Sequence, residues 1–398
     1  MQFRQVPKNG DNLSALGFGA MRLPTKFGRI DEERSIHQIR TAIDSGINYI
    51  DTAFMYGESE RVLGRALQDG YRQKVNLATK LPPWNLKKPE DMGTILDLQL
   101  KKLQTDHIDY YLLHSLDANS WKKFVDLGVF EFLEQAKKAG KITNIGFSFH
   151  GDRKTFKEII DAYDWIFCQI QYNFLDEDTQ AGKEGLLYAA SKKIAVIIME
   201  PLRGGMLSQK IPKEVKSIYA AAKTHRTAAS WGLRWVWNHP EVTVVLSGMN
   251  DESHITENIA TCEDAIPGIM TPDELEMMDK VKGVYHRLMK VECTGCSYCM
   301  PCPFGVNIPQ CFSFYNRYYM DGNHLEVRGF YGIQLMGGMG GTPAHASLCR
   351  SCGRCIQACP QHIAIPDELK KVARTLDGLR TKAMIPLIRL MFRPKKGE

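Results

Sequence analysis

Residues 1–265 alternate between two hydrophobic periods. Short runs rich in β-branched and aromatic residues predict strands, and the stretches between them repeat apolar residues at helical spacing. We expect strands over Leu16–Met21, Asn48–Thr52, Val75–Lys80, Ile108–His114, Asn144–Ser148, Trp165–Gln171, Val196–Glu200 and Thr243–Ser247. We expect helices over Asp31–Ser45, Glu58–Asp69, Asp91–Leu103, Phe130–Ala139, Lys154–Tyr163, Gly182–Lys192, Val215–Trp237 and Glu252–Thr261.

The strict alternation of strands and helices predicts an α/β fold, a parallel (β/α)8 TIM barrel. Several of the helices end before glycine, as at Gly46, Gly70 and Gly140, which suits a helix C-cap. A doubly wound sheet is the alternative, but no G-x-G-x-x-G motif opens the first helix. A further helix is expected over Thr271–Arg287, after the last strand and helix of the barrel.

Eight of the eleven cysteines form two runs near the C-terminus. The cysteines of these runs are Cys293, Cys296, Cys299 and Cys302, then Cys349, Cys352, Cys355 and Cys359. The second run has the C-x2-C-x2-C-x3-C-P spacing with which ferredoxins bind [4Fe-4S] clusters, and there the fourth cysteine often reaches the other cluster. The first run is one residue shorter at its last step. The sequence therefore predicts two [4Fe-4S] clusters and one-electron transfer.

Disulfides and zinc are the other uses of clustered cysteines. Residues 1–7 contain no apolar signal core, so we expect a cytoplasmic protein whose surroundings keep thiols reduced. Zinc needs four ligands, usually as two separated pairs, and fits two runs of four, each closed by proline, poorly. The remaining cysteines, Cys168, Cys262 and Cys311, stand alone and are expected to be packing residues.

A chain of 398 residues is too long for one ordinary hydrophobic core. We expect the barrel over residues 1–290 and a smaller, mainly helical, ferredoxin-like iron–sulfur domain over residues 291–398. The glycine-rich segment 337–341 lies between the cysteine runs and is not followed by Lys-Ser/Thr. It predicts a loop and not a phosphate-binding cradle.

The composition, with 44% hydrophobic and 24% charged residues, is typical of a globular protein. The net charge of +6 comes from the tail, because residues 370–398 hold nine Lys or Arg and two acidic residues. No basic face with interleaved aromatic residues is present on a recognisable module, so nucleic-acid binding is not expected. The apolar part of the tail, Ala383–Phe392, is expected to fold back against the barrel; an acidic redox partner or a membrane surface is the alternative.

Four polar residues fall at the C-terminal ends of predicted strands, where barrel enzymes place reactive groups. They are Asp51, Tyr56, Lys80 and His114. A tyrosine with a free pKa of about 10 is a poor acid unless a nearby cation lowers its pKa, and Lys80 can be that cation. Asp51 can keep Lys80 charged, and His114 can hydrogen-bond a substrate oxygen. Each residue alone has an ordinary structural explanation, but together they can protonate a carbonyl while hydride arrives at its carbon.

The segments that carry these residues resemble the aldo-keto reductase family. The resemblance rests on Asn48–Glu60, on Leu77–Lys80 and on Tyr110–His114, and it spans about residues 13–262. The cysteine-rich part resembles the ferredoxin-like extension of one branch of that family. The resemblance implies that Tyr56 is the general acid, that Lys80 and Asp51 modulate it, and that His114 orients the substrate.

The same resemblance implies a groove for a nicotinamide cofactor. The expected cofactor-binding residues are Ser148, Gln169, Met199, Pro201, Leu202, Arg203, Gly204, Gly205, Ser247, Gly248, Met249, Asn250, His254, Glu257 and Asn258. Four positions depart from the family: Phe149 replaces an asparagine, Met199 stands where many members stack an aromatic ring on the nicotinamide, Gly248 replaces a lysine and His254 an arginine. The replaced lysine and arginine usually bind the 2′-phosphate of NADP, so their absence weakens the case for NADP, and NAD stays open beside it.

Hydride transfer moves two electrons, whereas each cluster moves one, and a flavin can join the two. FMN in the barrel is therefore an alternative cofactor, with Arg203, Gly204, Gly205, Gly248 and Asn250 as a phosphate site. The main hypothesis is an iron–sulfur oxidoreductase that reduces a carbonyl or oxidises an alcohol, with a ferredoxin as a possible redox partner. The alternatives are an FMN-containing, ferredoxin-linked oxidoreductase and an electron-carrier module whose barrel is not catalytic.

Overall fold

The computed structural model describes residues 1–209, 211–320, 323–337 and 342–391, without side chains beyond residue 386. Contacts divide the chain into two compact units. The first unit contains Met1–Leu202 and Ala229–Leu275, and the second contains Arg203–Ala228 and Glu276–Glu398. The division into domains over 1–290 and 291–398 stays a prediction.

The first unit is built around a closed barrel of parallel strands, which confirms the predicted TIM barrel. Its strands are β3 (Leu16–Gly19), β6 (Tyr49–Asp51), β7 (Asn76–Leu81), β8 (Ile108–Leu116), β9 (Ile142–Phe149), β10 (Phe167–Gln171), β11 (Ala195–Met199) and β12 (Val242–Ser247). Each predicted strand matches one of them to within two residues at either end. Residues inside the barrel are apolar and fully buried, for example Tyr110, Leu112 and Val244, because parallel strands covered by helices are shielded from water.

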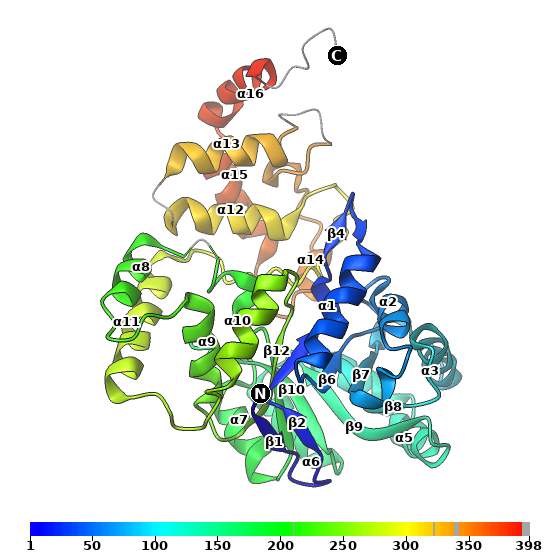
Figure 1. Cartoon of the computed structure of the whole chain (residues 1–398). Coiled ribbons are helices and arrows are strands. Elements are labelled where there is room, and N and C mark those ends of the chain that lie inside the picture. Colours follow the sequence, from blue (N-terminus) through cyan, green and yellow to red (C-terminus); the bar gives the residue numbers. More distant parts are fainter. Residues whose placement is uncertain (210, 321–322, 338–341, 392–398) are drawn as a thin grey trace. The chain divides into compact units, whose positions relative to one another are not determined.

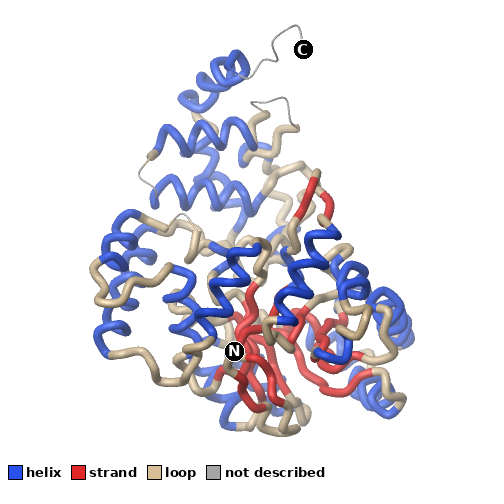
Figure 2. The backbone as a smooth tube through the Cα atoms, in the orientation of Figure 1, coloured by secondary structure: helices blue, strands red, loops and turns tan. Residues whose placement is uncertain are grey.

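Helices surround the strands, as Figures 1 and 2 show. They are α1 (Glu32–Asp44), α2 (Ser59–Ala66), α3 (Glu90–Leu103), α4 (Ala118–Asp126), α5 (Val129–Lys138), α6 (Arg153–Ala162), α7 (Gly182–Ser191), α9 (Ala228–Trp237) and α10 (Glu252–Cys262). Aspartates cap several of them, as Asp31, Asp117, Asp152 and Asp251 accept backbone N–H bonds in the first turn.

Three features of this unit were not predicted. Helix α4 follows β8, and an antiparallel hairpin of β1 (Phe3–Gln5) and β2 (Asn12–Ser14) precedes the barrel. The short hairpin of β4 (Thr25–Lys26) and β5 (Arg29–Ile30) follows β3. In the first hairpin, the Arg4 guanidinium donates to the carbonyls of Trp237, His239, Val242 and Ala265. Such long-range bonds leave no periodic signal in the sequence.

The prediction of one helix over Val215–Trp237 was wrong. The structure has two helices there, α8 (Lys213–Ala220) and α9, separated by residues 221–227. The intervening segment is largely polar and exposed, with His225 and Arg226 among its residues. Helix α8 buries Tyr219 in the second unit, whereas α9 buries its tryptophans in the barrel unit, so the two apolar faces have different partners.

The second unit is mainly helical, as expected. Besides α8 it contains α11 (Pro272–Leu288, of which Glu276 onward belongs here), α12 (Ile308–Met320), α13 (His324–Gln334), α14 (Arg354–Gln357), α15 (Ile365–Leu376) and α16 (Leu379–Met391). Helix α12 packs against α13 and α15, and α13 packs against α16 (Figure 1). Their common core includes Phe312, Tyr331, Leu369 and Val372, and most cluster-run cysteines lie against it.

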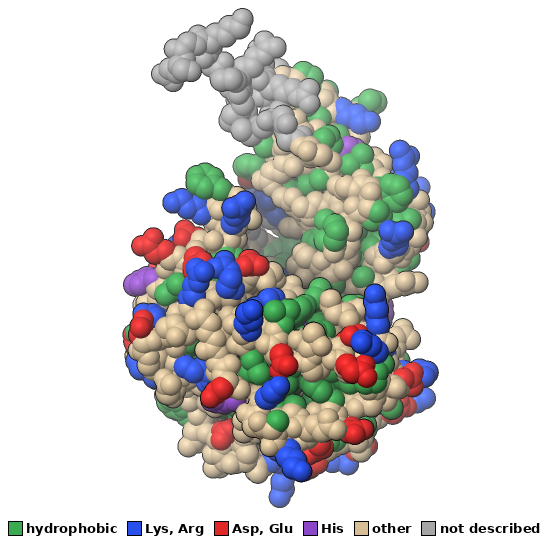
Figure 3. Space-filling view, turned by 90° about the vertical axis from the view of Figure 1, so that its right-hand side faces the viewer, with side chains coloured by type: hydrophobic (Ala, Val, Ile, Leu, Met, Phe, Trp, Pro, Cys, Tyr) green, Lys and Arg blue, Asp and Glu red, His purple; other side chains and the backbone are tan. Residues whose placement is uncertain are grey.

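Several predictions fall partly on residues outside the described parts of the chain. The glycine loop is described only at Gly337, and the apolar tail only as far as Pro386 for its side chains. Among the described residues, no helix is long and apolar enough to cross a membrane. Basic and acidic side chains are mixed over the face of the molecule drawn in Figure 3.

Candidate functional site

Asp51 and Lys80 form a buried ion pair at the C-terminal end of the barrel strands. Asp51 ends β6, and Lys80 lies near the end of the neighbouring β7. Lys80 Nζ lies 2.6 Å from both carboxylate oxygens of Asp51 and 2.8 Å from the carbonyl oxygen of Thr52. Lys80 is 1% exposed and Asp51 3% exposed. Burial lowers the pKa of Lys80, and the Asp51 carboxylate opposes that shift by stabilising the cation.

Tyr56 and His114 lie beside this pair. Tyr56, in the loop between β6 and α2, has its ring centroid 5.1 Å from Lys80 Nζ and 6.0 Å from the His114 ring. His114 is fully buried in β8, and burial lowers its pKa well below the usual range, with the Lys80 cation adding to the shift. The imidazole is therefore neutral at neutral pH. The structure thus brings all four predicted residues into one place.

A buried polar network supports Lys80 from behind. Glu60, at the start of α2, accepts hydrogen bonds from Thr79 Oγ1 at 2.8 Å and from Gln99 Nε2 at 2.9 Å. Gln99 Nε2 also donates to the carbonyl oxygen of Lys80 at 3.0 Å, and Tyr111 donates to Gln99 Oε1. Sequence reasoning missed this network. The signal that could have found it is an acidic residue on the apolar side of a helix, four positions after Tyr56.

Trp84 forms a second aromatic neighbour of His114. The two ring centroids lie 5.5 Å apart in an edge-to-face arrangement, while Trp84 is 49% exposed. Trp84 follows β7 in the short helical turn η3 (Pro83–Asn85). An exposed aromatic ring over a buried histidine can form an apolar wall for a substrate. The sequence analysis did not select it.

Ser148 and Gln169 lie side by side in register on β9 and β10. Ser148 Oγ accepts the Ser115 N–H at 2.7 Å, and its own hydroxyl proton can be donated elsewhere. Gln169 Nε2 lies 3.6 Å from Met199 Sδ. Gln169 Oε1 is buried without a hydrogen-bond partner among the described residues. A buried acceptor left unpaired in the apoprotein fits a ligand that donates an N–H, such as a carboxamide.

The predicted adenosine-binding segment follows β12. Ser247 Oγ accepts a hydrogen bond from Asn258 of α10 at 2.9 Å, so these two residues meet as expected. Met249 is buried, Asn250 is exposed, and His254 and Glu257 are half-buried on α10. Arg22, which sequence reasoning missed, lies beside Gly248, since a Cβ built on that glycine would stand 3.7 Å from Arg22 Cβ. A cation from elsewhere in the chain therefore borders the position that lacks lysine.

The loop after β11 divides between the two units. Pro201 is buried, and Leu202 packs near Gly232 of α9. Arg203, Gly204 and Gly205 form the short helical turn η4 (Arg203–Gly205), in which all three residues have positive φ.

Arg203 is not placed as a phosphate ligand of the barrel. It is 2% exposed and belongs to the second unit. Its Nη1 donates to Met289 Sδ at 2.8 Å, and its Nη2 donates to the carbonyl oxygen of Glu292 at 3.3 Å. The phosphate site that was considered for FMN thereby loses its cation. Glu292 immediately precedes Cys293, so Arg203 instead braces the chain where the first cysteine run begins.

The eight cysteines of the runs form two sets that cross between the runs. Cys299 interacts electrostatically with Cys293, Cys296 and Cys359. Cys355 interacts with Cys302, Cys349 and Cys352. The last cysteine of each run therefore lies with the first three of the other run.

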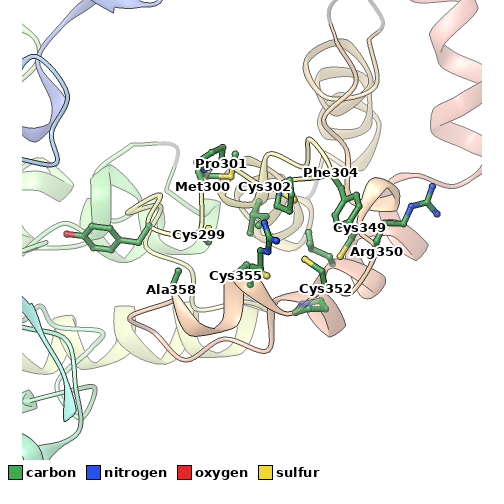
Figure 4. Close-up of a pocket in the computed structure, with 16 residues that line it drawn as sticks. Cys299, Met300, Pro301, Cys302, Phe304, Cys349, Arg350, Cys352, Cys355 and Ala358 are labelled. Carbon is green, nitrogen blue, oxygen red and sulfur yellow. The ribbon is translucent and has the colours of Figure 1, made fainter. Parts of the chain in front are cut away.

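The chemistry of these sets fits a cationic iron cluster. Burial, together with the neighbouring thiols, raises the pKa of Cys299 to about 12, so a thiolate at this position needs a cation for stabilisation. The second set surrounds a cavity of about 340 Å³ that all four of its cysteines line (Figure 4). Apolar residues such as Ile308, Pro366 and Leu369 complete the lining.

Within the parts of the chain that the structure describes, no three His, Cys, Asp or Glu side chains are grouped closely enough to hold a metal ion. The isolated Cys168, Cys262 and Cys311 are buried, in agreement with a packing role.

Comparisons with known proteins agree with both units. The chain is 28% identical over 284 residues to L-galactose dehydrogenase of Arabidopsis thaliana, and this match covers 65% of this chain and 88% of the relative. It is 27% identical to methylglyoxal reductase YeaE of Escherichia coli, over 70% of this chain and 95% of the relative.

Solved structures give the same result for the barrel. The aldo-keto reductase AKR11C1 of Bacillus halodurans in its holo form matches with a TM-score of 0.59 and 25% identity, over 71% of this chain and 96% of that chain. An aldo-keto reductase of Klebsiella pneumoniae in complex with NADPH shares the fold, with a TM-score of 0.58, 24% identity and the same coverages.

Two family models match the chain in succession. The model of the aldo/keto reductase family matches residues 15–281, which is more than half of the chain. The model of the 4Fe-4S dicluster domain matches residues 292–364, which contain all eight cysteines of the two runs. This chain is therefore a member of the aldo/keto reductase family that carries a 4Fe-4S dicluster domain.

Proposed function

We propose that this chain reduces a carbonyl, or oxidises an alcohol, at the Asp51–Tyr56–Lys80–His114 site and exchanges electrons through two [4Fe-4S] clusters. The observation that carries the proposal is the fully buried Asp51–Lys80 pair beside Tyr56 at the C-terminal end of the barrel. A buried pair of this kind orients a cation next to the tyrosine, which is the arrangement that a tyrosine proton donor requires.

The roles of the four residues follow from their geometry. Tyr56 transfers the proton of its hydroxyl to the oxygen of a bound carbonyl. Lys80 holds positive charge near Tyr56 and favours the phenolate that remains, while Asp51 holds the ammonium in place. His114 is neutral because of its burial, so its imidazole can orient the substrate oxygen by a hydrogen bond without adding charge. Trp84 excludes water from one side of His114.

Ser148 and Gln169 would hold the carboxamide of a nicotinamide cofactor. The unpaired Gln169 Oε1 supports this assignment, because an amide N–H can satisfy it. A bound nicotinamide supplies the hydride for the carbonyl carbon. Met199, next to Gln169, would lie against the ring, and Ser247 and Asn258 would form part of the adenosine site.

Arg22 favours NADPH over NADH. Its Cβ lies beside Gly248, where the family resemblance implies a lysine, and a guanidinium that extends from there can pair with a 2′-phosphate. The Klebsiella pneumoniae relative was solved with NADPH. We expect Arg22→Ala to raise the KM for NADPH by about tenfold and to leave the KM for NADH nearly unchanged. Equal changes for both cofactors would contradict this role of Arg22.

The two crossed cysteine sets would each hold one [4Fe-4S] cluster. One set is Cys293, Cys296, Cys299 and Cys359, and the other is Cys302, Cys349, Cys352 and Cys355. This crossing is the ligation pattern of two-cluster ferredoxins. Bound clusters supply one-electron transfer, and the cysteine thiolates and the apolar surroundings set their potentials.

A flavin would join two-electron and one-electron chemistry, which is the reason that FMN was considered. The burial of Arg203 in the second unit removes the cation of the suggested phosphate site. The intact tetrad, in turn, favours a catalytic barrel over an electron carrier without catalysis. The nicotinamide-linked oxidoreductase is therefore the function that the described residues support best.

Anaerobic purification followed by acid release of cofactors tests this function. We expect about eight iron and eight sulfide per chain, as two [4Fe-4S] clusters require, and less than about 0.1 flavin. One FMN per chain would overturn the nicotinamide assignment. Tyr56→Phe should then lower carbonyl reduction at least about a hundredfold, since general acid catalysis contributes roughly that much, while the iron content stays unchanged. Full activity of Tyr56→Phe would refute the assignment of the tetrad.

A further inference from the structure

The second cysteine set is the one that reaches the surface. Cys352 is the most exposed cysteine of the two runs and is classed as exposed, whereas the first set contains only half-buried and buried cysteines, such as Cys296 and Cys359. All four cysteines of the second set, together with Cys299 of the first, line the cavity drawn in Figure 4. A cluster held by this set would therefore be the one closest to a molecule docking from outside.

The charged side chains that line this cavity are both basic. Arg350 and Arg354 alternate with the cysteines along the chain, both are exposed, and they are the charged residues that line the cavity. Among the described residues neither arginine makes an ion pair. Figure 4 shows the Arg350 side chain reaching away from the cysteines, which places its charge at the rim.

The acidic residues on the neighbouring helix α15 do not cancel this charge. Asp367 pairs with Lys370 at 2.8 Å, and Glu368 pairs with Lys371 at 2.7 Å. Each carboxylate is thus matched by a lysine of its own helix, and the two arginines keep their effect. Phe304 adds an apolar contact to the same rim, since it is 43% exposed and lines the cavity.

We propose that the rim formed by Phe304, Arg350, Cys352 and Arg354, here named the Cys352 rim, is the docking site of an acidic one-electron carrier protein. The proposal rests on the function proposed above, because it requires a cluster in the second set. In each encounter one electron passes between the carrier and that cluster, so that one is oxidised as the other is reduced, and no bond forms or breaks.

Charge and exposure together support this occupant. Two unpaired guanidinium groups beside an apolar ring attract a protein that carries carboxylates around its redox centre. A neutral small molecule gains nothing from the arginines. Cys352 offers a route into the cluster, because it is the exposed cysteine of the set and its sulfur would be a direct ligand.

The test uses the full-length protein with its clusters, prepared anaerobically. The double variant Arg350→Glu/Arg354→Glu reverses the charge of the rim without touching a cysteine. The matched control Arg374→Glu/Arg380→Glu makes the same change of charge at two exposed arginines of the second unit that do not line the cavity. The probe is a reduced, acidic plant-type [2Fe-2S] ferredoxin, and stopped-flow absorbance follows reduction of the clusters. The assay is run at about 20 mM and about 500 mM salt, because electrostatic attraction between the two proteins is screened much more strongly at the higher salt concentration.

We expect the rim variant to be reduced at least about tenfold more slowly than the wild type at low salt, and to lose most of the salt dependence. The control variant should stay within about twofold of the wild type. Dithionite, a small reductant, should reduce all three proteins equally, and their iron and sulfide contents should agree.

Two outcomes would overturn the proposal. One is a rim variant that ferredoxin reduces as fast as the wild type at both salt concentrations. The other is a rim variant that keeps the wild-type rate with ferredoxin but loses binding to anionic lipid vesicles, which would make the rim a membrane-binding surface. A wild-type protein without iron, in contrast, would refute the proposed function itself, so the two failures are distinguishable.

Discussion

Replacing Lys80 by methionine should destabilise the barrel and abolish carbonyl reduction. The variant leaves the Asp51 carboxylate 3% exposed, without the ammonium that lies 2.6 Å from both of its oxygens. Removing one partner of a buried ion pair costs about 3–5 kcal/mol, because the other charge stays buried without compensation. The double variant Asp51→Asn/Lys80→Met carries no buried charge, so it should lose only about 1–3 kcal/mol, the cost of unsatisfied polar groups.

The assay is urea unfolding followed by tryptophan fluorescence. All six tryptophans of the chain lie in the barrel unit, so this signal reports on that unit. The double-mutant cycle then yields the coupling free energy of the pair. Activity should be lost in both variants, which separates the effect on chemistry from the effect on stability.

The pH dependence supplies a second check. Burial raises the pKa of Asp51, and in the wild type Lys80 opposes that shift. Without Lys80, the folded protein binds a proton at Asp51 more tightly than the unfolded chain does, so the free energy of unfolding of the variant falls as pH rises above about 3.9. The free energy of unfolding that the Lys80→Met variant loses relative to the wild type should therefore be smaller at pH 5.5 than at pH 7.5, by up to about 1.4 kcal/mol per pH unit. A loss below about 1 kcal/mol that does not change with pH would refute the reasoning, because it would mean that Asp51 is solvated.

Three further changes test other parts of the structure. Burial lowers the pKa of His114, so below pH about 6.5 the unfolded wild-type chain takes up a proton that the folded protein does not, and the free energy of unfolding of the barrel falls. In the His114→Gln variant this fall should be less steep. An unchanged slope between pH 7 and pH 5.5 would contradict this. Arg203→Met should lower the free energy of unfolding by about 1–3 kcal/mol and speed the loss of iron to a chelator. The control Arg287→Met breaks an exposed ion pair and should lower the free energy of unfolding by less than about 1 kcal/mol. Equal rates of iron loss in the two variants would argue against a bracing role of Arg203. Asp377 accepts hydrogen bonds from Tyr331 OH, His345 Nδ1 and the Ser347 N–H, just before Cys349. Asp377→Ala should therefore lower the free energy of unfolding by about 3 kcal/mol, so that the cluster absorbance bleaches at a lower concentration of guanidinium chloride. Coincident bleaching curves of variant and wild type would show that the network is dispensable.

The order of strands and helices in the barrel was readable from the sequence, because each element carries its own period. Runs such as Ile108–His114 are mostly apolar or aromatic, as expected for parallel strands that are buried on both faces. The helix ends were readable as well, since capping is a local interaction between residues three or four positions apart. The continuous helix expected over Val215–Trp237 failed because its two halves find different partners in space.

The residues of the site divide in the same way. Asp51, Tyr56, Lys80 and His114 could be selected because each follows or ends a predicted strand, and parallel strands of a barrel bring those ends together. Gln99 and Trp84 could not, since their roles depend on contacts between elements that are 19 to 39 residues apart. The contact of Arg203 with Glu292 could not be predicted, because nothing in its local sequence indicates that the side chain turns toward that carbonyl.

The sequence by itself determined the kind of chemistry in each half of the chain. The cysteine spacing implied clusters, and the strand-end tetrad implied carbonyl chemistry, because both depend on residue types at fixed local separations. Only the tertiary structure decided which cysteines share a set, since Cys302 and Cys359 each join residues of the other run across more than 46 positions. Only the structure, too, revealed that Cys352 of the second set is exposed, with Arg350 and Arg354 lining the same cavity, because solvent access is a property of the folded surface and not of spacing along the chain.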